Sequence, residues 1–94
     1  MKIFKESPNL GVYTTKHIIE KIAPILLVTH DKDGDWQFHG SEETVNMEGA
    51  KIILLSEMIE IDDSILEVAD LKKGYQAYRN SPNNKWRIRK MRND

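Results

Sequence analysis

The stretch HDKDGDWQFHG, residues 30–40, carries three aspartates at alternate positions and is the part of the sequence most suggestive of chemistry. Asp31, Asp33 and Asp35 would fall at positions 1, 3 and 5 of an EF-hand calcium loop, which also needs a glycine at position 6. Position 6 is Trp36, and the positive φ required there would strain so bulky a residue. Residues that favour β structure flank the stretch, whereas an EF-hand loop joins two helices. The sequence therefore predicts a turn here and no calcium site.

The dipeptide Asp33-Gly34 is a favoured pair for a two-residue type I′ hairpin turn, in which both central residues need positive φ. A turn centred on this pair aligns Asp31 with Trp36 and Thr29 with Phe38. One face, expected to be the core face, would then carry Leu27, Thr29, Trp36 and Phe38. The opposite face would carry Gln37 and His39.

The remaining residues that could support chemistry show no recognised spacing. His17, His30 and His39 follow neither an H-x-H nor an H-E-x-x-H pattern, so we expect no metal site. The chain has no cysteine, no G-x-S-x-G elbow and no glycine-rich phosphate loop, so we expect neither an enzyme nor a cofactor. One alternative stays open, an uncharacterised enzyme or small-ligand-binding domain with a pocket near His30, Gln37 and His39.

Charge is distributed unevenly although the net charge is only −1. Residues 1–30 carry +2. Residues 31–70 hold twelve acids against two lysines, for −10, and residues 71–94 hold eight basic residues against one acid, for +7. The split indicates either two binding faces of opposite sign or acidic and basic segments that lie side by side and neutralise each other.

The order of the expected elements is mixed. Residues 11–14 read as a strand, and Thr14 or Thr15 caps a helix that carries Ile18, Ile19 and Ile22 and ends before Pro24. After the hairpin, residues 40–49 read as a loop and residues 50–55 as a strand buried on both faces. Ser56 caps one short helix, Ser64 and Glu67 form a capping box for another, and Gly74 stops it.

The C-terminal part predicts a second hairpin, because residues 74–79 and 85–90 flank the turn-forming run NSPNN. Trp86 and Ile88 are expected to point inward, while Lys85, Arg87 and Arg89 point outward as on an edge strand. Ninety-four residues form one small domain. We therefore expect a single α+β domain with a largely antiparallel sheet and two or three short helices.

Composition also bears on compartment and partners. The absence of cysteine, of a signal-peptide pattern and of a long apolar run favours a cytoplasmic protein that does not enter a membrane. The basic run KWRIRKMR, residues 85–92, invites a nucleic-acid interpretation. With a pI of about 6.3 the chain is not basic overall, so we expect no nucleic-acid partner.

Several of these segments, in this order, resemble a bacterial family, immunity protein family 33, formerly a small domain of unknown function. The resemblance is carried by YTTKHI (residues 13–18), PILLVTHDKDGDWQF (24–38), LLSEMIEID (54–62), GYQAYR (74–79) and Trp86. It covers residues 11–88 and leaves residues 89–94 as a basic C-terminal tail. Tyr75 departs from the family pattern, which commonly has tryptophan there.

The resemblance implies a cytoplasmic, non-enzymatic protein that neutralises a toxin domain by binding it, with no catalytic residues to carry over. An acidic hairpin suits a basic toxin surface, because complementary charge steers association. We therefore expect the partner-binding residues to be Asp33, Asp35, Glu42 and Glu43. Oligomeric state is not predicted.

Overall fold

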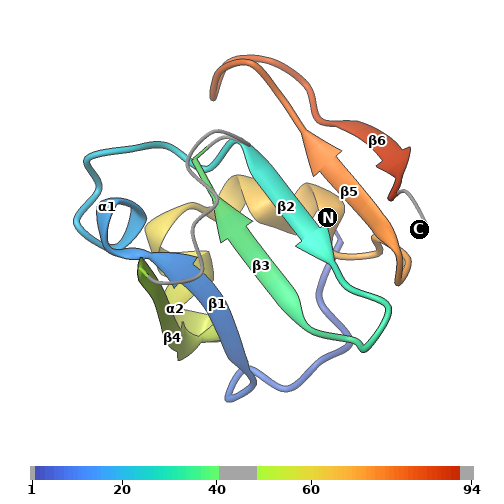
Figure 1. The fold of residues 1–94 in the computed structure, drawn as a ribbon, viewed down its shortest axis with the longest axis horizontal. Coiled ribbons are helices and arrows are strands. Elements are labelled where there is room, and N and C mark those ends of the chain that lie inside the picture. Colours follow the sequence, from blue (N-terminus) through green and yellow to red (C-terminus); the bar gives the residue numbers. More distant parts are fainter. Residues whose placement is uncertain (1, 41–48, 92–94) are drawn as a thin grey trace.

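The computed structural model describes residues 2–40 and 49–91, and six short strands dominate it (Figure 1). They are β1 (Gly11–Thr15), β2 (Leu27–His30), β3 (Trp36–His39), β4 (Ala50–Leu54), β5 (Tyr75–Tyr78) and β6 (Arg87–Lys90). The strands form one sheet in the order β4-β1-β3-β2-β5-β6. Neighbouring strands are antiparallel except β1 and β3, which are parallel. The sheet is thus mixed but mostly antiparallel.

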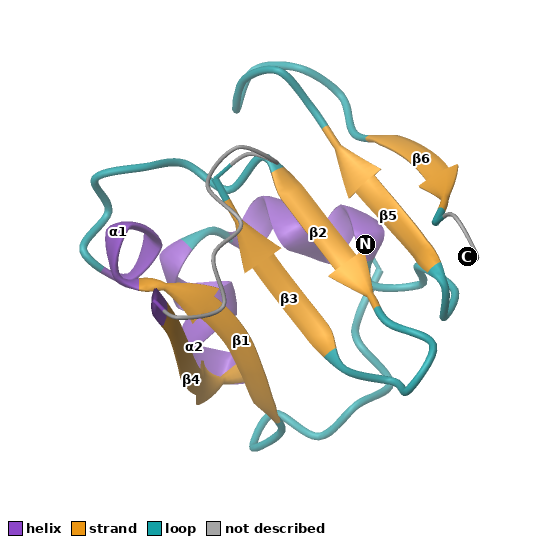
Figure 2. Cartoon of the chain, viewed as in Figure 1, coloured by secondary structure: helices purple, strands orange, loops and turns teal. Residues whose placement is uncertain are grey.

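The described residues also form three short helices: α1 (Lys16–Ile19), α2 (Leu55–Ile61) and the 3₁₀ helix η3 (Asp63–Val68). Figure 2 shows α2 and the helical segment that follows it behind the sheet. The Cα radius of gyration is 12.1 Å, close to the roughly 12 Å expected for a single domain of this length. The predicted α+β domain with a largely antiparallel sheet is confirmed. No helix in the described part of the chain is long and apolar enough to cross a membrane.

The core lies between the helices and one face of the sheet. Val12, Val28, Trp36, Phe38 and Ala77 contribute to it from the strands, and all five are at most 1% exposed. The buried side chains of the helices meet them from the other side: Ile18, Leu55, Met58, Ile65 and Val68. This burial is the main stabilising term for so small a domain.

The first helix is shorter than predicted. Thr15 caps α1, since its hydroxyl accepts a hydrogen bond from the Ile18 amide at 3.4 Å. The helix ends at Ile19, and Lys21 then adopts a positive φ of 60°. Of the three isoleucines expected on one buried face, only Ile18 is buried, while Ile22 is 69% exposed.

The caps of the later helices also differ from the prediction. Ser56 lies inside α2, which begins after Leu54; the Leu54 amide donates to the Glu57 carboxylate at 2.9 Å. Asp62 caps η3 and accepts hydrogen bonds from the amide and hydroxyl of Ser64 at 3.0 and 2.6 Å. A carboxylate thus takes the capping role expected of Ser64.

Two strands are more exposed than predicted, because they form the two edges of the sheet. Ile52 and Leu54 on β4 are 65% and 40% exposed, so this strand is not buried on both faces. The predicted C-terminal hairpin is confirmed as β5 and β6. On β6, however, Ile88 is 57% exposed although it pairs with the buried Ala77, whereas Trp86 just before it packs against the core.

Candidate functional site

The acidic stretch is the turn between β2 and β3, as predicted. The Asp31 amide donates to the Asp35 carbonyl at 2.8 Å, and the Gly34 amide donates to the Asp31 carbonyl at 2.9 Å. Gly34 has φ of 96°, whereas Asp33 has no positive φ. The connection is therefore a three-residue loop closed by a left-handed glycine and not the expected type I′ turn on Asp33-Gly34.

The extra loop residue shifts the strand register by one. Trp36 pairs with His30, and Phe38 pairs with Val28, so the predicted pairing of Asp31 with Trp36 is wrong. Trp36 and Phe38 still share the core face, but they share it with Val28 and His30 in place of Leu27 and Thr29. A shift of one residue exchanges the faces of a strand relative to its neighbour, which explains the error.

The carboxylates at the tip differ in their surroundings. Asp33 and Asp35 are exposed, and neither side chain has a hydrogen bond or ion pair with another described residue. Asp31 is half-buried and accepts a hydrogen bond from the Lys32 amide at 2.9 Å. The other two expected binding residues, Glu42 and Glu43, lie outside the described residues.

Basic side chains lie next to this acidic turn. A Cβ placed on Gly34 would be 3.8 Å from the ammonium nitrogen of Lys73, and one placed on Gly74 would be 3.6 Å from Cγ of Lys32. Elsewhere Asp62 pairs with Arg79 at 3.0 Å and Asp70 with Lys2 at 3.1 Å. Part of the charge asymmetry of the sequence is therefore neutralised in the fold.

The histidines of the hairpin lie on opposite faces of the sheet. His30 pairs with Trp36 on the core face, whereas His39 pairs with Leu27 on the other face. Nε2 of His39 lies 3.1 Å from Oε1 of Gln37, and burial lowers the pKa of His39 below its usual 6.5. The structure thus brings Gln37 and His39 together but places His30 away from them, so these three residues do not line one pocket.

His30 instead belongs to a cluster that sequence reasoning missed. Its ring stacks on Trp36 with a centroid distance of 4.0 Å and an interplanar angle of 14°. The Trp36 indole donates to Oε2 of Glu6 at 3.0 Å, and that oxygen lies 3.8 Å from Nε2 of His30. Phe4 packs edge-on against Trp36 at 5.0 Å. Glu6 lies 24 residues before His30 in a segment with no periodicity, so no local pattern marks it.

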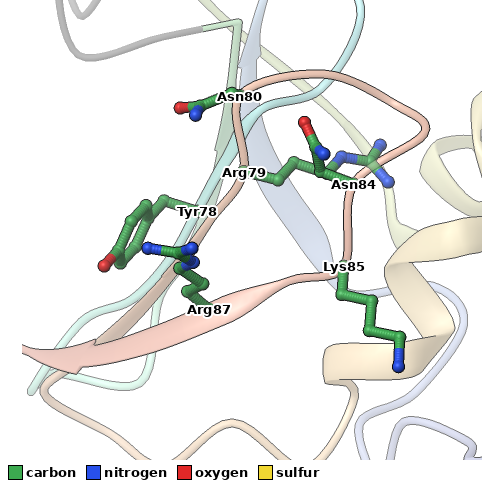
Figure 3. Close-up of a pocket in the computed structure, with 6 residues that line it drawn as sticks. All are labelled: Tyr78, Arg79, Asn80, Asn84, Lys85 and Arg87. Carbon is green, nitrogen blue, oxygen red and sulfur yellow. The ribbon is translucent and has the colours of Figure 1, made fainter.

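A cavity of about 320 Å³ lies at the β5–β6 connection and is lined by Tyr78, Arg79, Asn80, Asn84, Lys85 and Arg87 (Figure 3). The side chains diverge, since Lys85 points away from Tyr78 and Arg87. Arg79 is committed to structure: Nε and Nη2 donate to the Ile25 carbonyl at 3.1 and 2.9 Å, and its guanidinium lies 4.0 Å from the centre of the Trp86 ring. Arg79 thus holds the second hairpin in place, and the side chains that line this cavity do not converge on one point.

Within residues 2–40 and 49–91, no three histidine, aspartate or glutamate side chains come together in a way that could hold a metal ion. Comparisons with protein-family models, with curated proteins and with solved structures gave no match.

Proposed function

We propose that this chain is a small, non-enzymatic interaction protein that neutralises a toxin domain in the cytoplasm by docking its acidic hairpin against a basic surface of the toxin. Asp33 and Asp35 are the proposed contacts among the described residues, and Glu42 and Glu43, which lie outside them, are the other two proposed contacts. The resemblance of residues 11–88 to immunity protein family 33 supports the class of partner. The observation that carries the proposal is that Asp33 and Asp35 are exposed and unpaired among the described residues, on a turn with a defined backbone.

The turn presents these carboxylates in a fixed arrangement. Two backbone hydrogen bonds and the left-handed glycine define the loop, and the strands on either side of it are almost entirely buried. A preorganised loop loses little conformational entropy on binding. Exposed carboxylates attract a basic partner over a distance of about one Debye length, roughly 8 Å at physiological salt, and so accelerate encounter.

The lysines beside the turn limit how far this attraction extends. Lys32 and Lys73 border the loop, so the acidic surface is a tip and not a broad patch. We therefore expect binding to depend on close contact with Asp33 and Asp35, in addition to steering from a distance. A partner with an arginine or lysine cleft narrow enough to admit a hairpin tip fits this geometry.

The test replaces the acids without changing side-chain size. An Asp33→Asn/Asp35→Asn variant, alone and combined with Glu42→Gln/Glu43→Gln, is assayed for protection of cells that express a neighbouring gene whose product kills cells lacking this chain. Association rate is measured with the purified toxin domain over a range of salt concentrations. We expect the variants to fold, to associate about tenfold more slowly or worse, and to show a weaker salt dependence.

A matched control removes the same charge elsewhere. Glu60 and Glu67 are exposed, and neither side chain has a partner in the described part of the chain. A Glu60→Gln/Glu67→Gln variant should protect cells as well as the wild type does. If the control and the turn variant behave alike, net charge alone matters and the acidic hairpin is not the docking site.

A further inference from the structure

A second cavity, of about 550 Å³, lies beside the buried Glu6–His30 cluster. Ile3, Lys5 and Glu6 line it from the N-terminal segment, His30 from the end of β2, and residues 69–73 from the connection between η3 and β5. Its volume falls within the range typical of small-molecule sites, about 300 to 1,000 Å³. The site is separate in composition from Asp33 and Asp35, which do not line it.

Two buried acceptor atoms at this cavity have no hydrogen-bond partner within the described part of the chain. Nδ1 of His30 lies 2.6 Å from the Leu71 carbonyl. A carbonyl only accepts, so Nδ1 carries a hydrogen, and in the tautomer with one ring hydrogen Nε2 is an acceptor. Nε2 of His30 and Oε1 of Glu6 are both buried and unpartnered. Such atoms are costly to leave unsatisfied, and their presence indicates a missing hydrogen-bond donor.

The surroundings hold these two acceptors in position. His30 is 2% exposed, fixed by Leu71 on one side and stacked on Trp36 on another. Glu6 is fixed through its second oxygen, Oε2, which accepts the Trp36 indole hydrogen. Contacts with Leu71 and Trp36 thus hold the two side chains that supply the free acceptors.

The outer part of the cavity has the opposite character. Lys5, Lys72 and Lys73 are exposed, and none has an ion-pair partner among the described residues. Asp70, the acid of this rim, is paired with Lys2 at 3.1 Å. Ile3, Ala69 and Leu71 add apolar surface to the lining. A ligand thus meets acceptors at one end and cations at the other.

We propose that this cavity binds a small zwitterion of amino-acid size. Its ammonium group donates to Oε1 of Glu6 and Nε2 of His30, and its carboxylate pairs with the lysines of the rim. Entry requires a shift of the N-terminal segment, because both acceptors lie beneath the surface. The Lys2–Asp70 pair that ties this segment down is more than half exposed on both sides and is therefore a weak restraint.

The test is an NMR titration of the whole chain with glycine, β-alanine and γ-aminobutyrate, with methylammonium and acetate as separate halves of the ligand. The chain has two tryptophans, so a Trp86→Phe variant identifies the indole N–H signal of Trp36, which donates to Glu6. We expect at least one zwitterion to shift this signal saturably and to bind about tenfold or more tightly than either half alone. If no zwitterion moves the signal, or if methylammonium alone binds equally well, the proposal is wrong and a trapped water satisfies the acceptors.

Variants at the two ends of the site complete the test. Glu6→Gln should weaken the zwitterion about tenfold or more, as expected for loss of a charged hydrogen bond. A Lys72→Ala/Lys73→Ala variant changes only exposed side chains, so it should fold and should weaken the zwitterion without affecting methylammonium. Unchanged zwitterion binding in this lysine variant would overturn the proposal even if Glu6→Gln failed to fold. Asp33→Asn/Asp35→Asn should leave binding intact, which separates this site from the docking turn.

Discussion

The two hairpins of this protein use the same local elements but have different environments. Each pairs two strands of four residues around a turn rich in aspartate, asparagine, glycine or proline. In the first hairpin every residue of β2 and three of the four residues of β3 are buried. In the second, all four residues of β6 are exposed. Position in the sheet accounts for the difference, because β2 and β3 are central and β6 is an edge.

The central hairpin contributes mainly to the stability of the core, and the edge hairpin mainly to the basic surface. The central hairpin supplies Val28, Trp36 and Phe38 to the core and exposes only its acidic tip. The edge hairpin is held mainly by β5 and by Arg79, and it presents basic side chains to solvent, as edge strands often do to prevent unwanted pairing. We therefore expect substitutions in the central hairpin to lower the free energy of unfolding more than substitutions in the edge hairpin.

The largest difference in lost stability is expected between alanine variants of the two tryptophans. Trp36 is 1% exposed and contacts Phe4, His30 and Phe38, so Trp36→Ala should cost about 3 to 5 kcal/mol. Trp86 is only half-buried, so Trp86→Ala should cost clearly less. Thermal melts of the two variants measure this. Equal melting temperatures would show that the second hairpin is as important to the core as the first.

A more closely matched pair is Val28 and Ile88, which flank Ala77 on neighbouring strands. Val28 is 0% exposed and Ile88 is 57% exposed. Val28→Ala should cost roughly 1.5 to 3 kcal/mol, because buried methyl groups are lost. Ile88→Ala should cost less than about 1 kcal/mol. Urea unfolding of both variants gives the two values, and a reversed order would mean that β6 is covered in solution.

A smaller loss of stability is expected from a substitution of Gly34 in the acidic turn. Gly34 has φ of 96°, a conformation that an L side chain rarely adopts, so Gly34→Ala should cost about 1 kcal/mol. Gly49 has no positive φ, and a Cβ there would contact nothing within 4 Å. Gly49→Ala should therefore leave the free energy of unfolding unchanged or raise it slightly. A neutral Gly34→Ala would contradict the three-residue loop.

A further effect is a pH dependence of the stability of the fold, which arises from His39. Burial lowers the pKa of His39 in the folded chain below the usual 6.5, so the unfolded chain takes up the proton first as the pH falls. Neutral His39 makes its full contribution to the free energy of unfolding above pH 6.5. This contribution decreases as the pH falls from 6.5 to the lower pKa of His39 in the folded chain. Denaturant titrations at several pH values below 6.5 should show that the free energy of unfolding falls with pH, and His39→Asn should reduce this slope.

The control for this pH dependence is His17, which is exposed on α1. His17→Asn should leave the slope in place. If the slope survives in His39→Asn but disappears in His17→Asn, burial of His39 is not its source.

Local pattern determined much of this fold. Turn chemistry and β-forming runs predicted the turn at residues 31–35, the strands beside it and the C-terminal hairpin. Capping residues predicted that short helices are present, although of the predicted caps only Thr15 has that role. The burial of Trp36 and Phe38 on one face was predictable too, since alternation along a single strand places residues two apart together.

Only the tertiary structure decided what depends on distant segments. The register of β2 against β3 rested on whether the loop had two or three residues, and this choice put His30, and not Asp31, opposite Trp36. Exposure of Ile52 and Ile88 followed from strand order, because an edge strand and a central strand can have the same apolar composition. The contact of Glu6 with Trp36, and through it with His30, joins segments more than twenty residues apart. No spacing rule links such segments, since their approach results from packing of the whole chain around one core.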